Sequence, residues 1–369
     1  MKKSLFAMGM LAMAVASCTN EEVVDIPSSK GISFNNPYVG TSVRAVIPGA
    51  DAGETTTEKL QEENAGFYVY GGYKDVDDVF KGTHVTYSGG VWGYTPVRYW
   101  VDDQVYKFNA YAPDMGVTPT FSWGSDEDAN DAVLTFTGIT VKGNATYQKD
   151  FVIGKSNVQK PTADNIPGNV AITMKHALSM IKVSLTDGFA DGVKLKIANF
   201  TINGIKTQGN FVQKGNVVEG STGVAGDWTV IGEAEAVGSS SFNHIGYTLN
   251  KNNDVYANEY IVIPQAVAAD AITVTFDGML YDVDGHPIEV PGGVVDGIAD
   301  DGAQGGDIVT NKKSFTIKIP TIEAGWEMNK RYNYTATING TTFGMKEIIF
   351  DDPTIEDWGD YSNTPVTIE

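Results

Sequence analysis

The stretch Val105-Tyr106-Lys107-Phe108-Asn109-Ala110-Tyr111 indicates the fold class of this 369-residue chain. Apolar side chains at positions 106, 108 and 110 alternate with polar ones at 107 and 109, which is the period-two pattern of a β-strand. Pro113 ends this strand, because proline has no N–H to give to a ladder. The same period recurs along the chain, so the sequence predicts an all-β protein.

Strand-like segments of this kind are separated by turn residues throughout. Two of these segments predict a β-hairpin, in which Val85-Thr86-Tyr87 pairs with Val91-Trp92-Gly93-Tyr94 across the turn Ser88-Gly89-Gly90. A turn is expected at Asn203-Gly204 and another at Asp284-Gly285. No amphipathic helix longer than two turns is expected. The further predicted strands are 67–70, 98–100, 133–136, 151–153, 170–174, 181–185, 193–197, 200–202, 205–212, 260–265, 272–276, 279–282, 288–290, 315–320, 332–338, 348–350 and 366–368.

Chains beyond about 250–300 residues divide into domains. We therefore expect two β-sandwiches in tandem, residues 31–178 and residues 179–369, with the junction close to Leu178.

The N-terminus has the features of a lipoprotein export signal. Lys2 and Lys3 precede an apolar run from Leu5 to Val15, which is too short to span a bilayer and closes on Ala16-Ser17-Cys18. Residues 1–17 are predicted to be a signal peptide, and Cys18, the single cysteine, is predicted to carry the lipid. The alternative is an ordinary secretory peptide with an incidental cysteine. Residues 18–30 are then a tether.

The predicted mature chain is strongly acidic. Removal of residues 1–17 leaves 24 basic against 46 acidic side chains. Such a field repels nucleic acid and anionic headgroups, so neither is an expected partner, and attachment to the outer membrane would depend on the acyl chains at Cys18.

Catalytic and metal-binding motifs are weak. His84, His176, His244 and His286 form no i, i+4 pair, the chain has no Gly-x-Ser-x-Gly elbow, and its one thiol is the predicted lipid site. The acidic runs 126–131 and 296–307 are the best calcium candidates, but neither has EF-hand spacing, and a turn role is preferred. No catalytic residue, metal or cofactor is predicted. Trp92, Trp123, Trp228 and Trp326 could serve a carbohydrate site, although packing roles are favoured.

Several motifs in order make the chain resemble the fimbrillin family of pilin lipoproteins, also called type V pilins. They are the lipobox at Cys18, Gly31-Ile32-Ser33-Phe34 followed by Arg44, Pro96-Val97-Arg98-Tyr99-Trp100 followed by 106–111, Met174-Lys175-His176-Ala177-Leu178-Ser179-Met180-Ile181, Tyr260-Ile261-Val262-Ile263-Pro264, and Ile355-Glu356-Asp357-Trp358. The resemblance implies two tandem transthyretin-like, Greek-key β-sandwiches.

The resemblance also implies how such a subunit assembles. A protease that prefers arginine would cut between Arg44 and Ala45 and release residues 31–44 as a removable strand. A strand of another subunit would replace it. Alternatively, Arg44 is an ordinary exposed arginine, and Lys30 is an earlier candidate whose cleavage would spare the strand.

The C-terminal tail has the alternation that a donor strand needs, with apolar residues two apart at Val366 and Ile368. The alternative is that this tail closes the chain's own second sandwich.

The expected function is therefore a structural subunit of a cell-surface fimbria, which supports adhesion and has other pilin subunits and a possible host or bacterial receptor as partners. The alternative is a non-polymerising surface lipoprotein that binds glycan or host protein. A hydrolase is the third class considered.

Overall fold

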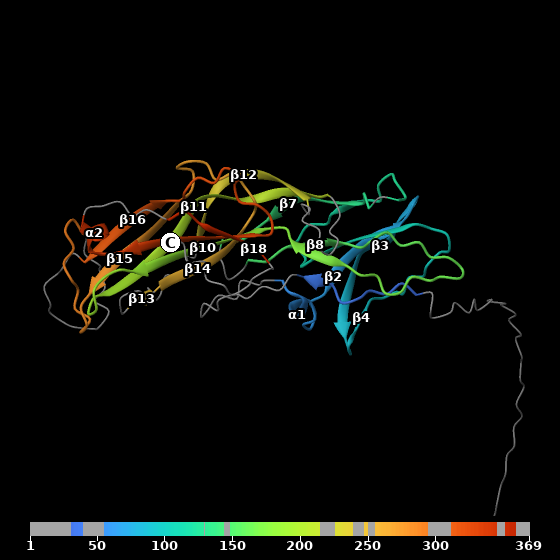
Figure 1. Cartoon of the computed structure of the whole chain (residues 1–369), viewed down its shortest axis with the longest axis horizontal. Helices are drawn as coiled ribbons and strands as arrows, with labels where there is room; N and C mark the ends of the chain where they lie inside the picture. The colour runs from blue at the N-terminus through green and yellow to red at the C-terminus, as the bar shows by residue number, and fades with distance from the viewer. Residues whose placement is uncertain are drawn as a thin grey trace, which may run out of the picture.

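The computed structural model describes residues 31–39, 55–128, 130–143, 148–214, 226–238, 247–249, 255–293, 311–344 and 351–358. The predicted all-β class is confirmed (Figure 1), since strands β1–β18 contain almost all of the regular structure and the helices α1 (Thr57–Leu60) and α2 (Gly340–Gly344) have only four and five residues. Within the described residues, no helix has the length and apolar character needed to cross a membrane.

The first sheet, called the N-terminal sheet, has seven strands in the order β1-β9-β8-β5-β2-β3-β4. Its strands are β1 (Tyr38–Val39), β2 (Phe67–Tyr73), β3 (Val76–Ser88), β4 (Val91–Gly93), β5 (Tyr106–Ala112), β8 (Val152–Lys155) and β9 (Thr173–His176). The predicted hairpin is confirmed, because Tyr87 pairs with Trp92 between β3 and β4. Only the β1–β9 pair is parallel.

The other two sheets contain most of the later strands. The four-stranded sheet has the order β14-β10-β17-β18, with β10 (Ser179–Asp187), β14 (Val255–Val262), β17 (Lys330–Ile338) and β18 (Thr354–Asp357). The long sheet has the order β16-β15-β11-β7-β6, with β12 and β13 also paired to β11. Its strands are β6 (Thr120–Ser122), β7 (Val133–Thr140), β11 (Lys194–Gln213), β12 (Gly226–Gly238), β13 (Tyr247–Leu249), β15 (Thr273–Tyr281) and β16 (Lys312–Lys318).

The 20-residue strand β11 runs through most of the molecule. Its first half pairs with β13 and β15, and its second half pairs with β7, so strands from both sides of residue 178 share one sheet. Figure 1 accordingly shows an elongated molecule, with β2, β3 and β4 towards one end and β13, β15 and β16 at the other.

Three apolar cores separate these layers. The aromatic core, which includes Phe34, Phe67 and Phe108, covers one face of the N-terminal sheet. The junction core, which includes Tyr111, Phe136, Phe211 and Trp358, covers its other face and reaches β7 and β11. The C-terminal core fills the space between the four-stranded sheet and the long sheet.

Several details of the predicted strands are wrong. Residues 98–100 and 288–290 do not form strands, although Tyr99 makes an isolated bridge to Gly31. The turn expected at Asn203-Gly204 is a bulge inside the continuous strand β11, where the pairing register shifts between Ile202 and Ile205. Gly204 permits it with φ +90°, and a Cβ there would lie 2.1 Å from the carbonyl oxygen of Ala271. Similarly, residues 272–276 and 279–282, predicted as two strands, form one strand, β15, between β11 and β16.

Strand β5 is buried along its whole length, polar residues included. Its even positions face the aromatic core, and Tyr111 faces the junction core. Lys107 and Asn109 are fully buried, and the Lys107 ammonium and the Asn109 amide nitrogen donate to loop and strand acceptors, whereas Asn109 Oδ1 has no hydrogen-bond partner among the described residues. The predicted strand is therefore central, with both faces covered.

Candidate functional site

The N-terminal segment 31–39 fits into the wall of the aromatic core as an extended strand. Ile32, Phe34 and Val39 are buried, with 1–3% of their surface exposed. The Phe34 ring makes edge contacts with Phe67, Phe80, Tyr94 and Phe108 at centroid distances of 5.5–6.0 Å. The segment thus supplies the side chain at the centre of this core.

Backbone hydrogen bonds hold the segment on both sides. The Ile32 N–H donates to the Arg98 carbonyl at 2.8 Å, next to an antiparallel bridge between Gly31 and Tyr99. On the opposite side, Val170 donates to the Ser33 carbonyl at 2.7 Å and accepts from the Asn35 N–H at 2.9 Å. Because alternate residues of a strand turn their backbone groups to opposite sides, the segment closes a gap between two stretches of chain far apart in sequence.

Side chains secure the ends of the segment. The Tyr94 hydroxyl donates to the Ile32 carbonyl at 2.7 Å, and Ser33 donates to the Asn169 side chain. The Asn36 carboxamide accepts from Trp92 and Gln61 at 3.1 and 2.9 Å. At the far end, β1 pairs in parallel with β9, and the Val39 N–H donates to Thr57 at 3.1 Å.

Removal of the segment would leave a groove of defined chemistry. Re-exposing each of its three apolar side chains costs about 1.5–3 kcal/mol, and each lost backbone bond about 1 kcal/mol. Val170 would be left with an unpaired buried N–H and carbonyl, and Arg98 with an unpaired carbonyl. A groove of this kind accepts an extended peptide with alternating apolar side chains.

Exposed apolar side chains line one side of this segment. Of the six exposed large apolar residues among those described, four lie at Val91, Val97, Tyr99 and Val101. Residues 97, 99 and 101 alternate outward, while Trp100 points into the aromatic core. A surface of this composition beside a groove favours contact with another protein.

The site residues predicted from the sequence lie outside the described residues. These are Cys18, Arg44, Ala45, Val366 and Ile368, together with the signal peptide, the tether and residues 40–44 of the removable strand. The described part contains the strand-forming residues 31–39, and at the other end it stops at Trp358.

The histidines within the described residues have packing or turn roles. His84 stacks on Tyr68, with ring centroids 4.6 Å apart, and contacts the Ala65 carbonyl. His176 is buried at the junction of the sheets, with a hydrogen bond to Asp150. His286 belongs to the turn described next.

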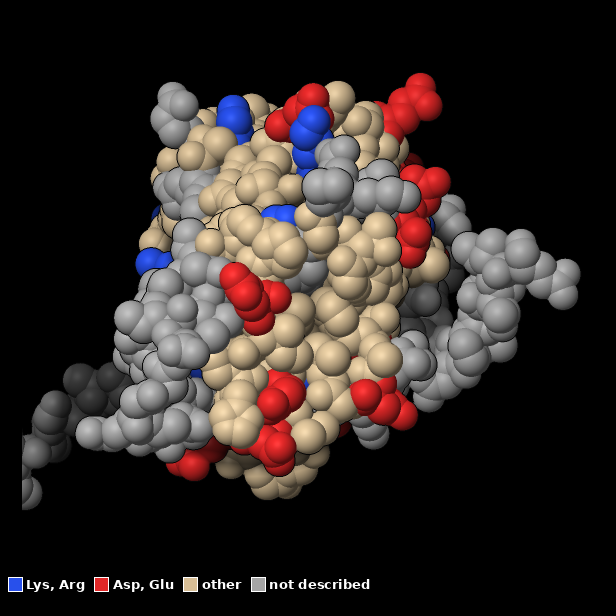
Figure 2. All heavy atoms as spheres, turned by 90° about the vertical axis from the view of Figure 1, so that its left-hand side faces the viewer, with Lys and Arg blue, Asp and Glu red and all other residues tan. Residues whose placement is uncertain are grey.

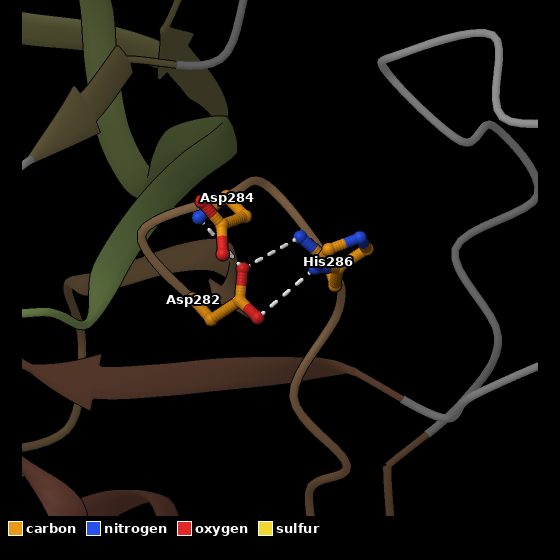
Figure 3. Close-up of side chains that lie close together, drawn as sticks. All are labelled: Asp282, Asp284 and His286. Atoms are coloured by element: carbon orange, nitrogen blue, oxygen red, sulfur yellow. Dashed lines mark hydrogen bonds and ion pairs between the residues drawn. The ribbon is translucent and has the colours of Figure 1, made fainter.

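Asp282, Asp284 and His286 come together in the turn between β15 and the following segment (Figure 3), with one possible ligand atom from each residue within 4.8 Å of the others. The Asp282 carboxylate accepts from the backbone N–H groups of His286 and Asp284 at 2.8 and 2.9 Å, and from the His286 ring at 3.1 Å. The His286 N–H is the main reason that the pKa of Asp282 is lowered. Sequence reasoning identified the Asp284-Gly285 turn but not the contribution of His286, for which the Asp-x-Asp-Gly-His spacing is the available signal.

The calcium candidate at 126–131 is a capped loop. Burial alone would raise the pKa of Asp131, but hydrogen bonds from Lys107, Ser125 and Asp126 hold it well below its usual range. The Lys107 ammonium also donates to the Trp123 and Asp126 carbonyls and lies 3.7 Å from the Trp123 ring centroid. The Asp131 carboxylate is thus paired with the buried Lys107 ammonium. Separately, the preferred packing role of Trp123 and Trp326 is confirmed by their burial.

The acidity of the chain extends to its surface. On the end of the molecule shown in Figure 2, acidic side chains outnumber basic ones and the basic ones are scattered. The described residues on that end form no basic patch.

The fold and the buried N-terminal segment define a class of β-sandwich proteins in which an N-terminal strand completes an apolar core, and comparison with known proteins gives the family. A model of the fimbrillin-like family matches residues 52–358. The chain therefore belongs to the fimbrillin-like family.

Individual relatives are distant. Fimbrium subunit Fim1C of Phocaeicola vulgatus is 26% identical over 206 residues, which cover 48% of this chain and about half the length of that relative. A fimbrial protein from Bacteroides vulgatus has a similar crystal structure, with a TM-score of 0.54, 17% identity, and coverage of 89% of this chain and 99% of the other. This second likeness supports the fold.

Proposed function

We propose that this chain is a structural subunit of a cell-surface fimbria, exported as an outer-membrane lipoprotein through Cys18 and supporting adhesion. Its partners are then other fimbrial subunits, and the relatives named above are fimbrial proteins. The observation that carries the proposal is the position of residues 31–39, which fill a gap between Tyr99 and Val170 with buried apolar side chains.

In the proposed assembly, cleavage between Arg44 and Ala45 frees the segment, and the C-terminal strand of another subunit enters the groove. Val366 and Ile368 would occupy two of the apolar positions held before by Ile32, Phe34 and Val39. Backbone bonds to Arg98 and Val170 would be re-formed by the incoming strand, so the exchange replaces one set of contacts by a similar one.

The domain division at residue 178 is part of the same proposal. The first sandwich would receive a strand, and the second would carry the donor tail. The exposed apolar residues at 97, 99 and 101 support a subunit contact next to the groove.

Treatment with an arginine-specific protease tests this function. The expected result is a new N-terminus at Ala45 together with SDS-resistant ladders, and the variant Arg44→Ala should give neither. Lys30→Ala is the matched control and should behave like the wild-type chain. An intact lipidated monomer that binds glycan or host protein would contradict the assembly role and support the non-polymerising alternative.

A further inference from the structure

Two motifs that the groove does not involve meet in the interior. His176, from the stretch 174–181, stacks flat on Trp358, from the stretch 355–358, with ring centroids 4.2 Å apart and an interplanar angle of 1°. Both side chains are about 1% exposed. The stack therefore fixes the last described residue of the chain against the end of β9.

The other side of His176 leads to the N-terminal part of the chain. The His176 Nδ1 lies 2.8 Å from Asp150 Oδ2, and the same oxygen accepts the Thr55 N–H at 2.8 Å. Thr55 also donates its hydroxyl to the Asp150 carbonyl at 2.7 Å. Thr55 is the first described residue after 39, and it precedes α1, so one carboxylate oxygen joins the chain that follows the N-terminal segment to the ring under Trp358.

The arrangement is poorly explained by stability alone. Asp150 is fully buried, and neither Asp150 Oδ1 nor His176 Nε2 has a hydrogen-bond partner among the described residues. A buried polar pair with unsatisfied atoms is often no more stable than an apolar replacement of the same shape. A role in holding two segments in one arrangement accounts for its presence.

Trp358 packs in the junction core and is also joined to its local strand. Its N–H donates to the Asn329 carbonyl at 2.7 Å, directly after the β17–β18 ladder that ends at Asp357. Weaker packing of Trp358 therefore destabilises β18. Through His176 and Asp150 it also destabilises the hydrogen bonds of Thr55.

We propose that Asp150 and His176 are positioning residues that couple the start of the C-terminal tail, at Trp358, to the chain that follows the proposed cleavage site, at Thr55. Local opening at Trp358 or at Thr55 is transmitted to the other residue through the shared Asp150 carboxylate oxygen and the stacked His176 ring. The consequence for assembly rests on the proposed function. The tail would begin at a fixed position, Trp358, and cleavage of the N-terminal segment would change how firmly Trp358 is held.

Hydrogen exchange on the monomeric chain tests the coupling without any assembly. Trp358→Leu should speed exchange of the β18 amides, and also exchange of the Thr55 amide by about tenfold, because the opening of one end is shared with the other. Phe276→Leu is the matched control, since Phe276 is equally buried and stacks on Phe315 in the C-terminal core, away from the pair. When the two variants are compared at the same global stability, this control should leave the exchange rate of the Thr55 amide unchanged. An unchanged Thr55 in Trp358→Leu would overturn the proposal.

A second variant separates coupling from simple packing. His176→Phe keeps a ring against Trp358 but has no nitrogen to face Asp150, so β18 should stay protected while Thr55 no longer responds to Trp358→Leu. If the lone buried carboxylate prevents folding, the double variant His176→Phe/Asp150→Asn removes its charge and makes the same comparison possible. A Thr55 response that persists in either background would overturn the role of the pair.

Assembly is a separate readout. Trp358→Leu subunits should form protease-triggered ladders more slowly than Phe276→Leu subunits. Failure of the wild-type chain to form ladders would reject the proposed function, whereas the exchange data judge the coupling alone.

Discussion

At the scale of single residues, Phe34 is the side chain on which the account depends most. It contacts four aromatic rings from β2, β3, β5 and the segment after β4, although it comes from a strand with few backbone bonds. The sequence predicted a strand at Gly31-Ile32-Ser33-Phe34. It could not predict which rings receive Phe34, because those lie 33–74 residues away in the chain.

We expect Phe34→Ala to lower the free energy of unfolding of the intact chain by about 3–5 kcal/mol, since it opens a cavity in the aromatic core. After cleavage and removal of residues 31–44, the variant and the wild-type chain are identical, so their stability should agree. Urea unfolding of both forms measures this, with Phe34→Leu as the milder control. Equal stability of the intact wild-type chain and the intact Phe34→Ala variant would contradict the central position of Phe34 in the aromatic core.

A second residue-scale effect is the pH dependence caused by Lys155. Burial lowers the pKa of this lysine to about 8, with the positive charge of Lys107 as a further cause. Between about pH 8 and the ordinary lysine pKa, the unfolded chain holds a proton that the folded chain has released. The free energy of unfolding contributed by Lys155 therefore rises with pH in that window.

Accordingly, any stability advantage of Lys155→Met over the wild-type chain should shrink by about 2 kcal/mol between pH 8 and pH 10. Urea unfolding at both pH values measures this change. Lys160→Met, which removes a lysine from an exposed position, is the control. A difference for Lys155→Met that stays constant with pH would show that the buried ammonium does not titrate in this range.

At the scale of elements, local patterns predicted strands well and long-range pairing poorly. The hairpin of β3 and β4 follows from Ser88-Gly89-Gly90, and β10, β14 and β17 follow from apolar alternation. The parallel pairing of β10 with β17 joins residues about 150 apart, which no local signal encodes. The bulge in β11 was predicted as a turn, because Asn-Gly has the same local signature in both settings.

Gly204→Ala tests that bulge. Its Cβ would meet the Ala271 carbonyl oxygen at 2.1 Å, at a backbone φ of +90°. Gly285→Ala is matched in φ, at +89°, but has open space around the Cβ. We expect the first variant to lose at least about 2 kcal/mol more than the second in urea unfolding, since only it adds a clash to the backbone strain. Equal losses would contradict the tight packing of β11 against β15.

At the scale of the whole molecule, β11 joins two sandwiches into one elongated body, and β2, β3 and β4 lie towards the end opposite to β13, β15 and β16 (Figure 1). The sequence predicted two sandwiches but not a sheet that contains strands from both sides of residue 178. The described residues contain neither the proposed cleavage site nor the proposed donor tail, and of the proposed site they include only the strand that would be displaced.

The exposed apolar residues beside the groove should matter for assembly and not for folding. Val97→Lys/Tyr99→Lys should slow protease-triggered ladder formation by about tenfold, which corresponds to about 1.4 kcal/mol in the barrier. The urea midpoint should stay within the range of ordinary surface substitutions. Val283→Lys, at an exposed position in the β15 turn, is the control. Unchanged ladder formation would exclude this surface from the subunit contact.

The most direct test of the central claim is disulfide trapping between a groove residue and the tail. In chains carrying Cys18→Ser, one subunit receives Asn169→Cys, beside Ser33, and another receives Thr367→Cys, which lies between Val366 and Ile368 and would take the position of Ser33. After cleavage at Arg44 and mild oxidation, an intermolecular disulfide between the two positions is expected, and the uncleaved mixture should not form it. Cleaved subunits that assemble into ladders without this disulfide would contradict replacement of residues 31–39 by the C-terminal strand.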